Sequence, residues 1–163
     1  MKSIFSCLLC VLLFATGCVS SKRASVAYVL APEIPAKPDG TVPVRIAELA
    51  LPEYLNRLEL VRRKGRNQVV ISQYGRWATN LRAQMQSLLN QMVFAKEKTS
   101  LRIHFQSFTA DDKGFSAEGV AYWEDGKEQP FTVFQPGKCD TDDLLVHKAD
   151  EALSQVAQQL SKN

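Results

Sequence analysis

Few side chains in this 163-residue sequence have the types and spacing that catalysis or metal binding needs. The two histidines, His104 and His147, lie far apart, and no Cys or second His stands near either at ligand spacing. The acidic pair Asp142–Asp143 falls where we expect a helix to begin, and capping explains it. Phosphate-binding glycine motifs and the motifs of serine hydrolases and zinc proteases are absent. We therefore expect no enzyme activity, no metal and no cofactor.

The first 18 residues have the pattern of a bacterial lipoprotein signal. Lys2 supplies a positive charge, and residues 4–15 are almost wholly apolar but too short to span a bilayer as a helix. Small residues then lead to Cys18, whose sulfur we expect to carry lipid, including palmitate. Val19 after the cysteine favours the outer membrane, since an Asp there usually retains a lipoprotein at the inner membrane. Ala15 stands where Leu is usual, so an ordinary secretory signal without lipid is the alternative.

Cleavage before Cys18 would divide the chain into a signal peptide, 1–17, a lipid tether, 18–24, and a single periplasmic domain, 25–163. Cys7 and Cys10 would leave with the signal, so their C-x-x-C spacing is not a redox motif. Cys139 then has no partner in an oxidising compartment, and we expect a buried, small hydrophobic residue there. The net charge of +3 is too weak and dispersed to suggest nucleic-acid binding.

The pattern of apolar residues predicts an α+β fold. Apolar residues at helical spacing predict one helix from Trp77 to Val93 and a second over 145–160. A proline-rich linker occupies 32–43, and Asp125–Gly126 predicts a hairpin turn. Two amphipathic helices should therefore cover one face of a mostly antiparallel sheet. Alternation of apolar and polar residues predicts its strands at 25–30, 42–46, 58–62, 67–72, 101–106, 115–123 and 131–134.

The densest basic cluster falls at the expected tip of a hairpin between two of these strands. A solvated turn explains such a cluster, and the alternative is contact with anionic lipid headgroups or an acidic partner. The cluster consists of Arg62, Arg63, Lys64 and Arg66.

Two other segments combine aromatic and basic residues. Residues 51–57, L-P-E-Y-L-N-R, contain a proline that interrupts a strand, which suits either a structural bend or a protein interface. In the second segment, 74–77, Trp77 most simply packs in the core, and Arg76 can pair with a carboxylate or stack on an aromatic ring. We expect a partner or self-association interface formed by Tyr54, Arg57, Arg76 and Trp77.

The order and spacing of these segments resemble the ABC-type transport auxiliary lipoproteins, the PqiC- and YmbA-like family. The likeness extends over essentially the whole mature chain. It departs from the family at 79–80, where Thr-Asn replaces the usual Glu-Pro after R-W-A. The residues that carry it are Tyr28 and Leu30 behind the lipoprotein cysteine, L-P-x-Y-L-x-R at 51–57, V-R-R at 61–63 and R-W-A at 76–78.

The resemblance implies a non-enzymatic accessory lipoprotein of the outer membrane, facing the periplasm, in an MCE-type system that moves phospholipids between membranes. The implied partner is the MCE-domain membrane protein of the same system, with a homo-oligomer as a further possibility. Two other functions stay open: a structural outer-membrane assembly lipoprotein of the pilotin or export-plug type, and a periplasmic lipid-binding module. A hydrophobic cavity of about 300 Å³ or more would favour the lipid-binding module.

Overall fold

The computed structural model describes residues 24–65 and 67–161. The signal peptide, Cys18 and Arg66 lie outside the described residues. The expected division into signal, tether and domain therefore stays a prediction.

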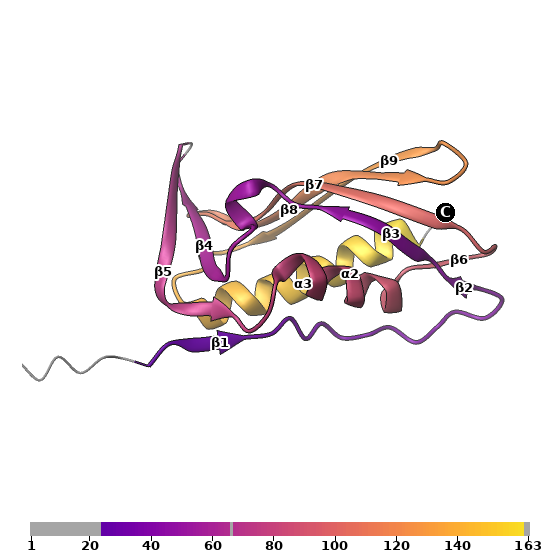
Figure 1. Cartoon of the computed structure of the whole chain (residues 1–163). Coiled ribbons are helices and arrows are strands. Elements are labelled where there is room, and N and C mark those ends of the chain that lie inside the picture. The colour runs from indigo at the N-terminus through magenta and orange to yellow at the C-terminus, as the bar shows by residue number, and fades with distance from the viewer. Residues whose placement is uncertain (1–23, 66, 162–163) are drawn as a thin grey trace, which may run out of the picture.

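A mixed seven-stranded sheet forms one layer of the molecule (Figure 1). Its strand order is β1-β5-β4-β7-β8-β9, with β3 beside β7 as well. The strands are β1 (Val26–Tyr28), β3 (Arg45–Ala50), β4 (Glu59–Lys64), β5 (Gln68–Trp77), β7 (Ser100–Ala110), β8 (Gly114–Trp123) and β9 (Glu128–Pro136). The short strands β2 (Val42–Pro43) and β6 (Phe94–Ala95) pair separately.

The predicted meander is confirmed in β7, β8 and β9, which pair antiparallel in sequence order. Asp111 accepts backbone hydrogen bonds in the first turn, and Gly126, at φ +87°, provides the left-handed conformation of the second. Three other pairings are parallel: β1 with β5, β3 with β7 and a single pair between β4 and β7. The two strands β3 and β4 lie along the same side of β7, and Pro52 and the short 3₁₀ helix η1 (Glu53–Leu55) interrupt the chain between them.

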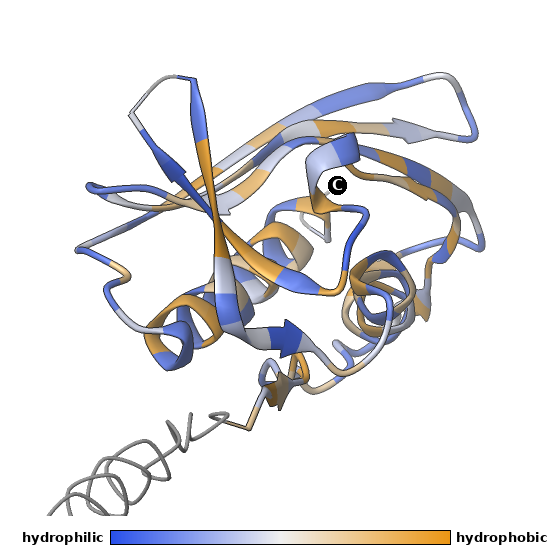
Figure 2. Cartoon of the chain, turned by 60° about the vertical axis from the view of Figure 1, so that its left-hand side comes forward, coloured by the Kyte–Doolittle hydropathy of each residue, from blue (hydrophilic) through white to orange (hydrophobic). Residues whose placement is uncertain are grey.

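Two helices, α2 (Leu81–Met92) and α3 (Asp142–Leu160), lie under one face of the sheet, as predicted. Figure 2 shows that hydrophobic and hydrophilic residues alternate around each helix. The buried apolar residues of the helices and of the sheet form one core cluster. The core is closely filled: Met85, Leu89, Leu101, Ile103 and Leu153 are all 0 % exposed. Burial of these apolar side chains is the main force that holds the helices to the sheet.

Helix α2 begins four residues later than predicted. The apolar spacing placed its start at Trp77, whereas β5 continues through Trp77 and the helix begins at Leu81. Pairing with other strands overrides the local pattern, since Trp77 lies opposite Tyr28. Asn80 then caps the helix, with its side chain accepting a hydrogen bond from the Ala83 amide at 3.2 Å.

The stretch 29–41, which contains most of the proline-rich linker expected at 32–43, is tied to the helices. The Leu30 amide donates to Gln84 of α2 at 3.0 Å, and the Ala31 amide donates to Asp150 of α3 at 2.9 Å. The helices therefore lie between the sheet on one side and this extended strap, residues 29–41, on the other (Figure 1).

Candidate interaction site

Three of the four segments that carry the family resemblance meet at one end of the molecule. The Trp77 amide donates to the Leu58 carbonyl at 2.5 Å, and the Ala78 amide donates to the Tyr28 carbonyl at 2.7 Å. The Arg82 guanidinium reaches Asn56 at 2.9 Å. Strand pairing thus joins residues that lie far apart in the sequence into one surface, which we call the junction: residues 26–28, 51–59 and 75–78.

Three of the four predicted interface residues are available at the junction surface. Arg57 and Arg76 are exposed, and the Arg76 guanidinium donates to Ser25 at 2.9 Å. Tyr54 is half-buried, and burial raises the pKa of its phenol, which therefore stays protonated near neutral pH. The fourth residue, Trp77, is only 5 % exposed and belongs to the core. Its side chain packs in the core beneath the junction surface.

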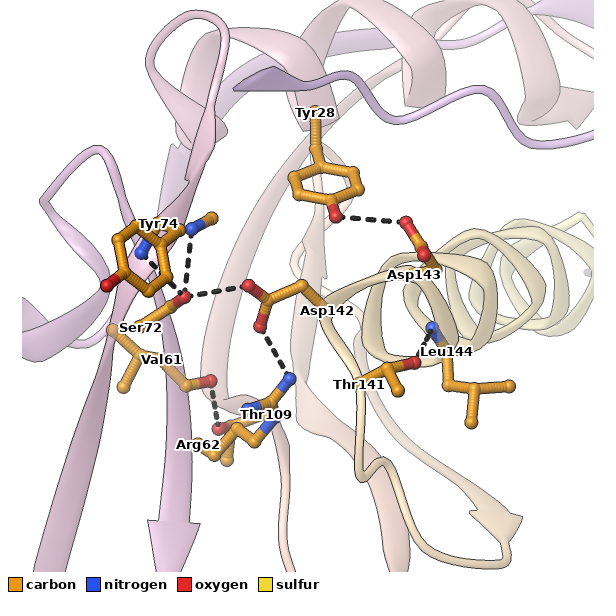
Figure 3. A network of polar contacts seen from close by, with 11 residues as sticks. Tyr28, Val61, Arg62, Ser72, Tyr74, Thr109, Thr141, Asp142, Asp143 and Leu144 are labelled. Carbon is orange, nitrogen blue, oxygen red and sulfur yellow. Dashed lines mark hydrogen bonds and ion pairs between the residues drawn. The ribbon is translucent and has the colours of Figure 1, made fainter. Parts of the chain in front are cut away.

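An ionic and hydrogen-bonded cluster attaches the junction to the start of α3 (Figure 3). Asp142 accepts from Arg62 at 2.5 Å and from Ser72 at 2.7 Å. The Ser72 hydroxyl also accepts from the Gly75 amide at 2.9 Å. A carboxylate in the first helical turn is favoured by the positive end of the helix dipole. We call Arg62, Ser72, Gly75 and Asp142 the Asp142 clamp, because it holds β4, β5 and α3 together.

Gly75 is the position where the clamp depends on the absence of a side chain. A Cβ there would lie 2.1 Å from the Asp142 carboxylate oxygen Oδ2 and 2.9 Å from Leu60 Cδ1. The sequence contained one indication of this requirement for glycine, since a glycine inside a strand often marks the close approach of another group. The identity of that group, Asp142, had no signal in the sequence.

The predicted basic cluster is divided by the fold. Arg62 points into the clamp, with 25 % of its side chain exposed, and is not part of a solvated tip. Arg63 and Lys64 are exposed, and Arg66 lies outside the described residues. Two basic side chains are therefore presented at this end of the described hairpin.

The other residues with potential chemistry are dispersed. His104 packs edge-on against Tyr122, with ring centroids 5.1 Å apart, and His147 lies 3.4 Å from Glu151 on the same helix. Cys139 is 4 % exposed, as expected, and burial raises the pKa of its thiol. Among the residues that the structure describes, no three His, Cys, Asp or Glu side chains lie together as a metal site would need. No helix in the described ranges has the length and apolar character required to cross a membrane.

Hollows occur on the described surface rather than inside the core. One of about 590 Å³ lies between the strap and α3 and is lined largely by polar residues, including His147, Asp150 and Gln155. A more apolar hollow of about 190 Å³ lies where the strap passes Met92 and Phe94. A third hollow, of about 340 Å³, is largely apolar and lies between Val29 and Leu30 of the strap and Ala83 and Leu88 of α2. The lipid-binding module therefore stays an open alternative.

The chain is thus an α+β domain in which the junction lies next to β1, the first described strand. The family model described as "ABC-type transport auxiliary lipoprotein component" matches residues 28–101, a range that includes the whole junction except its first two residues. The match agrees with the family resemblance that the sequence motifs predicted. It supports an accessory role in transport.

Solved structures agree with the fold. One, described only as an uncharacterized protein, has a TM-score of 0.66 and 18 % identity, and the match covers 85 % of this chain and 97 % of that one. Another, from Xanthomonas campestris and described under the family name DUF330, has a TM-score of 0.66 and 13 % identity, covering 83 % of this chain and 92 % of that one. At such identities the likeness shows the fold alone. No curated protein matches the sequence.

Proposed function

We propose that this protein is a non-enzymatic accessory lipoprotein of the outer membrane that serves an MCE-type intermembrane phospholipid transport system. Lipid on Cys18 anchors it, and its domain faces the periplasm. The exposed part of the junction, formed by Tyr54, Arg57 and Arg76, contacts the MCE-domain protein or a second copy of the chain.

The observation that carries this proposal is the convergence of the family's motif segments beside β1, the first described strand. The tether of a lipidated Cys18 would enter the domain at this same end. Aromatic and arginine side chains are common in the energetically important centre of protein interfaces. Several polar side chains elsewhere among the described residues have structural roles in caps, turns and strand ends, as Asp111, Thr141 and Glu124 do.

The decisive experiment is co-purification with the MCE-domain protein, comparing the wild type with the double variant Arg57→Ala plus Arg76→Ala. Both side chains are exposed, so the variant should fold normally and lose at least about tenfold in affinity if each contributes more than about 1 kcal/mol. Trp77 is unsuitable for this test, because truncating a buried Trp costs about 3–5 kcal/mol of folding stability.

A matched control removes two exposed arginines elsewhere on the sheet. Arg45→Ala plus Arg102→Ala changes the net charge by the same amount, and these residues lie on the neighbouring strands β3 and β7. The control should bind the partner like the wild type. Undiminished binding by the folded Arg57/Arg76 variant would remove these residues from the interface.

The alternative of a structural assembly lipoprotein is distinguished by the genes that accompany this one. A neighbouring gene for an MCE-domain membrane protein supports the transport role. A secretion or lipopolysaccharide-export operon would contradict it and favour the pilotin or export-plug function.

A further inference from the structure

The hairpin of β4 and β5 extends beyond the rest of the sheet. In the described structure, the last pairing of β4 with β7 joins Arg62 to Ala110, and β1 covers β5 only at 75–77. Residues 63–64 and 68–69 are therefore paired only with each other, and the hairpin stands away from the domain in Figure 1. We call the described residues 63–65 and 67–71 the arm.

The arm presents apolar and basic side chains together. Val69 is 47 % exposed, and Val70 and Ile71 are each 44 % exposed, so both faces of this strand offer β-branched side chains to solvent. Arg63 lies directly opposite Val69, and Lys64 opposite Gln68. Three consecutive exposed apolar residues are a costly arrangement in water unless a partner covers them.

Within the arm itself, the charged residues are all basic, although the whole chain has a net charge of only +3. The acidic residue at the base of the arm, Asp142, is paired with Arg62. An anionic surface is therefore the complementary partner. The stems of Arg and Lys can extend along apolar material while their charged ends reach phosphate groups.

The length of the tether agrees with a membrane as the partner. This step rests on the lipid anchor of the proposed function. The eight Cα–Cα steps from Cys18 to Val26 can extend over at most about 26–29 Å. The strand from Gly75, beside β1, to Gln68 measures about 23 Å. The arm can thus reach the bilayer in which the anchor is inserted.

We propose that the arm is a second membrane contact: Val69, Val70 and Ile71 enter the boundary between headgroups and acyl chains of an anionic bilayer, and Arg63 and Lys64 bind the phosphates. The Asp142 clamp holds the base of the arm at a defined angle to the domain. An acidic protein is the competing partner, and the test separates the two.

The test uses the mature chain with Cys18→Ser, so that no lipid anchors it, and with Val70→Cys labelled by a polarity-sensitive fluorophore. Cys139 is buried and should not react. Vesicles of phosphatidylethanolamine and phosphatidylglycerol should shift the emission to shorter wavelength, whereas phosphatidylcholine vesicles should not. The matched control is Phe134→Cys, which replaces a 51 % exposed residue on β9. Its emission should not change.

A charge comparison completes the test. Arg63→Glu plus Lys64→Glu should lower partition into the anionic vesicles at least about tenfold. Lys96→Glu plus Lys98→Glu makes the same change in net charge near the other end of β7 and should have a much smaller effect. No spectral response at position 70, an equal response at 134, or equal losses in both charge variants would overturn the proposal. Binding of an MCE-domain protein is measured separately, without vesicles. If the arm does not bind membranes, the proposed function is therefore not contradicted.

Discussion

At the residue scale, Gly75 is the position in the candidate site where a side chain would meet the tightest obstruction, the Asp142 carboxylate. We predict that Gly75→Ala lowers the free energy of unfolding by about 1–3 kcal/mol, because its Cβ would occupy the position of the Asp142 carboxylate. Urea denaturation of the mature domain measures the change.

A double-mutant cycle tests the cause of this effect. In an Asp142→Ala background the obstructing carboxylate is gone, so Gly75→Ala should cost clearly less. The same cost in both backgrounds would mean that the clamp does not explain the requirement for glycine.

Asp150 provides a second prediction at this scale. Burial raises the pKa of its carboxyl to about 6, and the hydrogen bond from the Ala31 amide partly opposes the shift. A pKa raised in the folded state means that folding is favoured when the group is protonated. Protonated Asp150 therefore stabilises the folded state fully below the unfolded pKa near 4, and this stabilisation is lost as the pH rises to about 6.

Asp150→Asn should therefore remove much of the fall in stability between about pH 4 and 6 and stabilise the domain at pH 7 by about 1–3 kcal/mol. The amide oxygen can still accept from Ala31. Thermal unfolding at a series of pH values measures this, with the exposed neighbour Glu151→Gln as the control. If the stability of Asp150→Asn fell with pH as steeply as that of the wild type, a group other than Asp150 would cause the fall.

At the element scale, the helix starts depend on side-chain caps. Thr141 caps α3 by accepting a hydrogen bond from the Leu144 amide at 3.2 Å. Thr141→Ala should cost about 1 kcal/mol of unfolding free energy, whereas Thr141→Ser should retain most of the stability because its hydroxyl can make the same bond. Equal losses in the two variants would show that the cap contributes little. Chemical denaturation distinguishes these outcomes.

Most elements could be predicted from the sequence because their signals are local. The alternation of apolar residues located the meander, the turn residues at 111–114 and 125–126 located its hairpins, and the spacing of apolar residues from 145 onward located α3. The start of α2 could not be predicted this way. Trp77 fits a helical stripe, and only its pairing with Tyr28, which is distant in the sequence, keeps it in a strand.

The candidate site was predicted less completely for the same reason. Residues 51–57 and 76–78 were selected from their composition and the family resemblance, but their contact through Leu58 and Trp77 depends on the tertiary fold. In the sequence, nothing distinguishes Arg62 from the other basic residues of its cluster. Its pairing with Asp142, 80 positions away, separates it from Arg63 and Lys64.

At the scale of the whole molecule, the proposed lipid anchor on Cys18 would determine where the domain can act. We predict that mass spectrometry of the mature protein finds an N-terminal Cys18 carrying acyl chains, and that globomycin causes the unprocessed precursor to accumulate. Two or three acyl chains suffice for stable anchoring, since each buried methylene contributes about 0.8 kcal/mol. A mature N-terminus without acyl modification would contradict the anchor.

We propose that the junction, and not another face of the domain, contacts the transport machinery. A photo-crosslinking amino acid placed at Arg57 in living cells tests this, with Phe134 on β9, where the side chain is 51 % exposed, as the comparison. We predict an adduct between position 57 and an MCE-domain protein, and none from position 134. An adduct from position 134 alone, or none from position 57 although the protein is folded and lipidated, would contradict it.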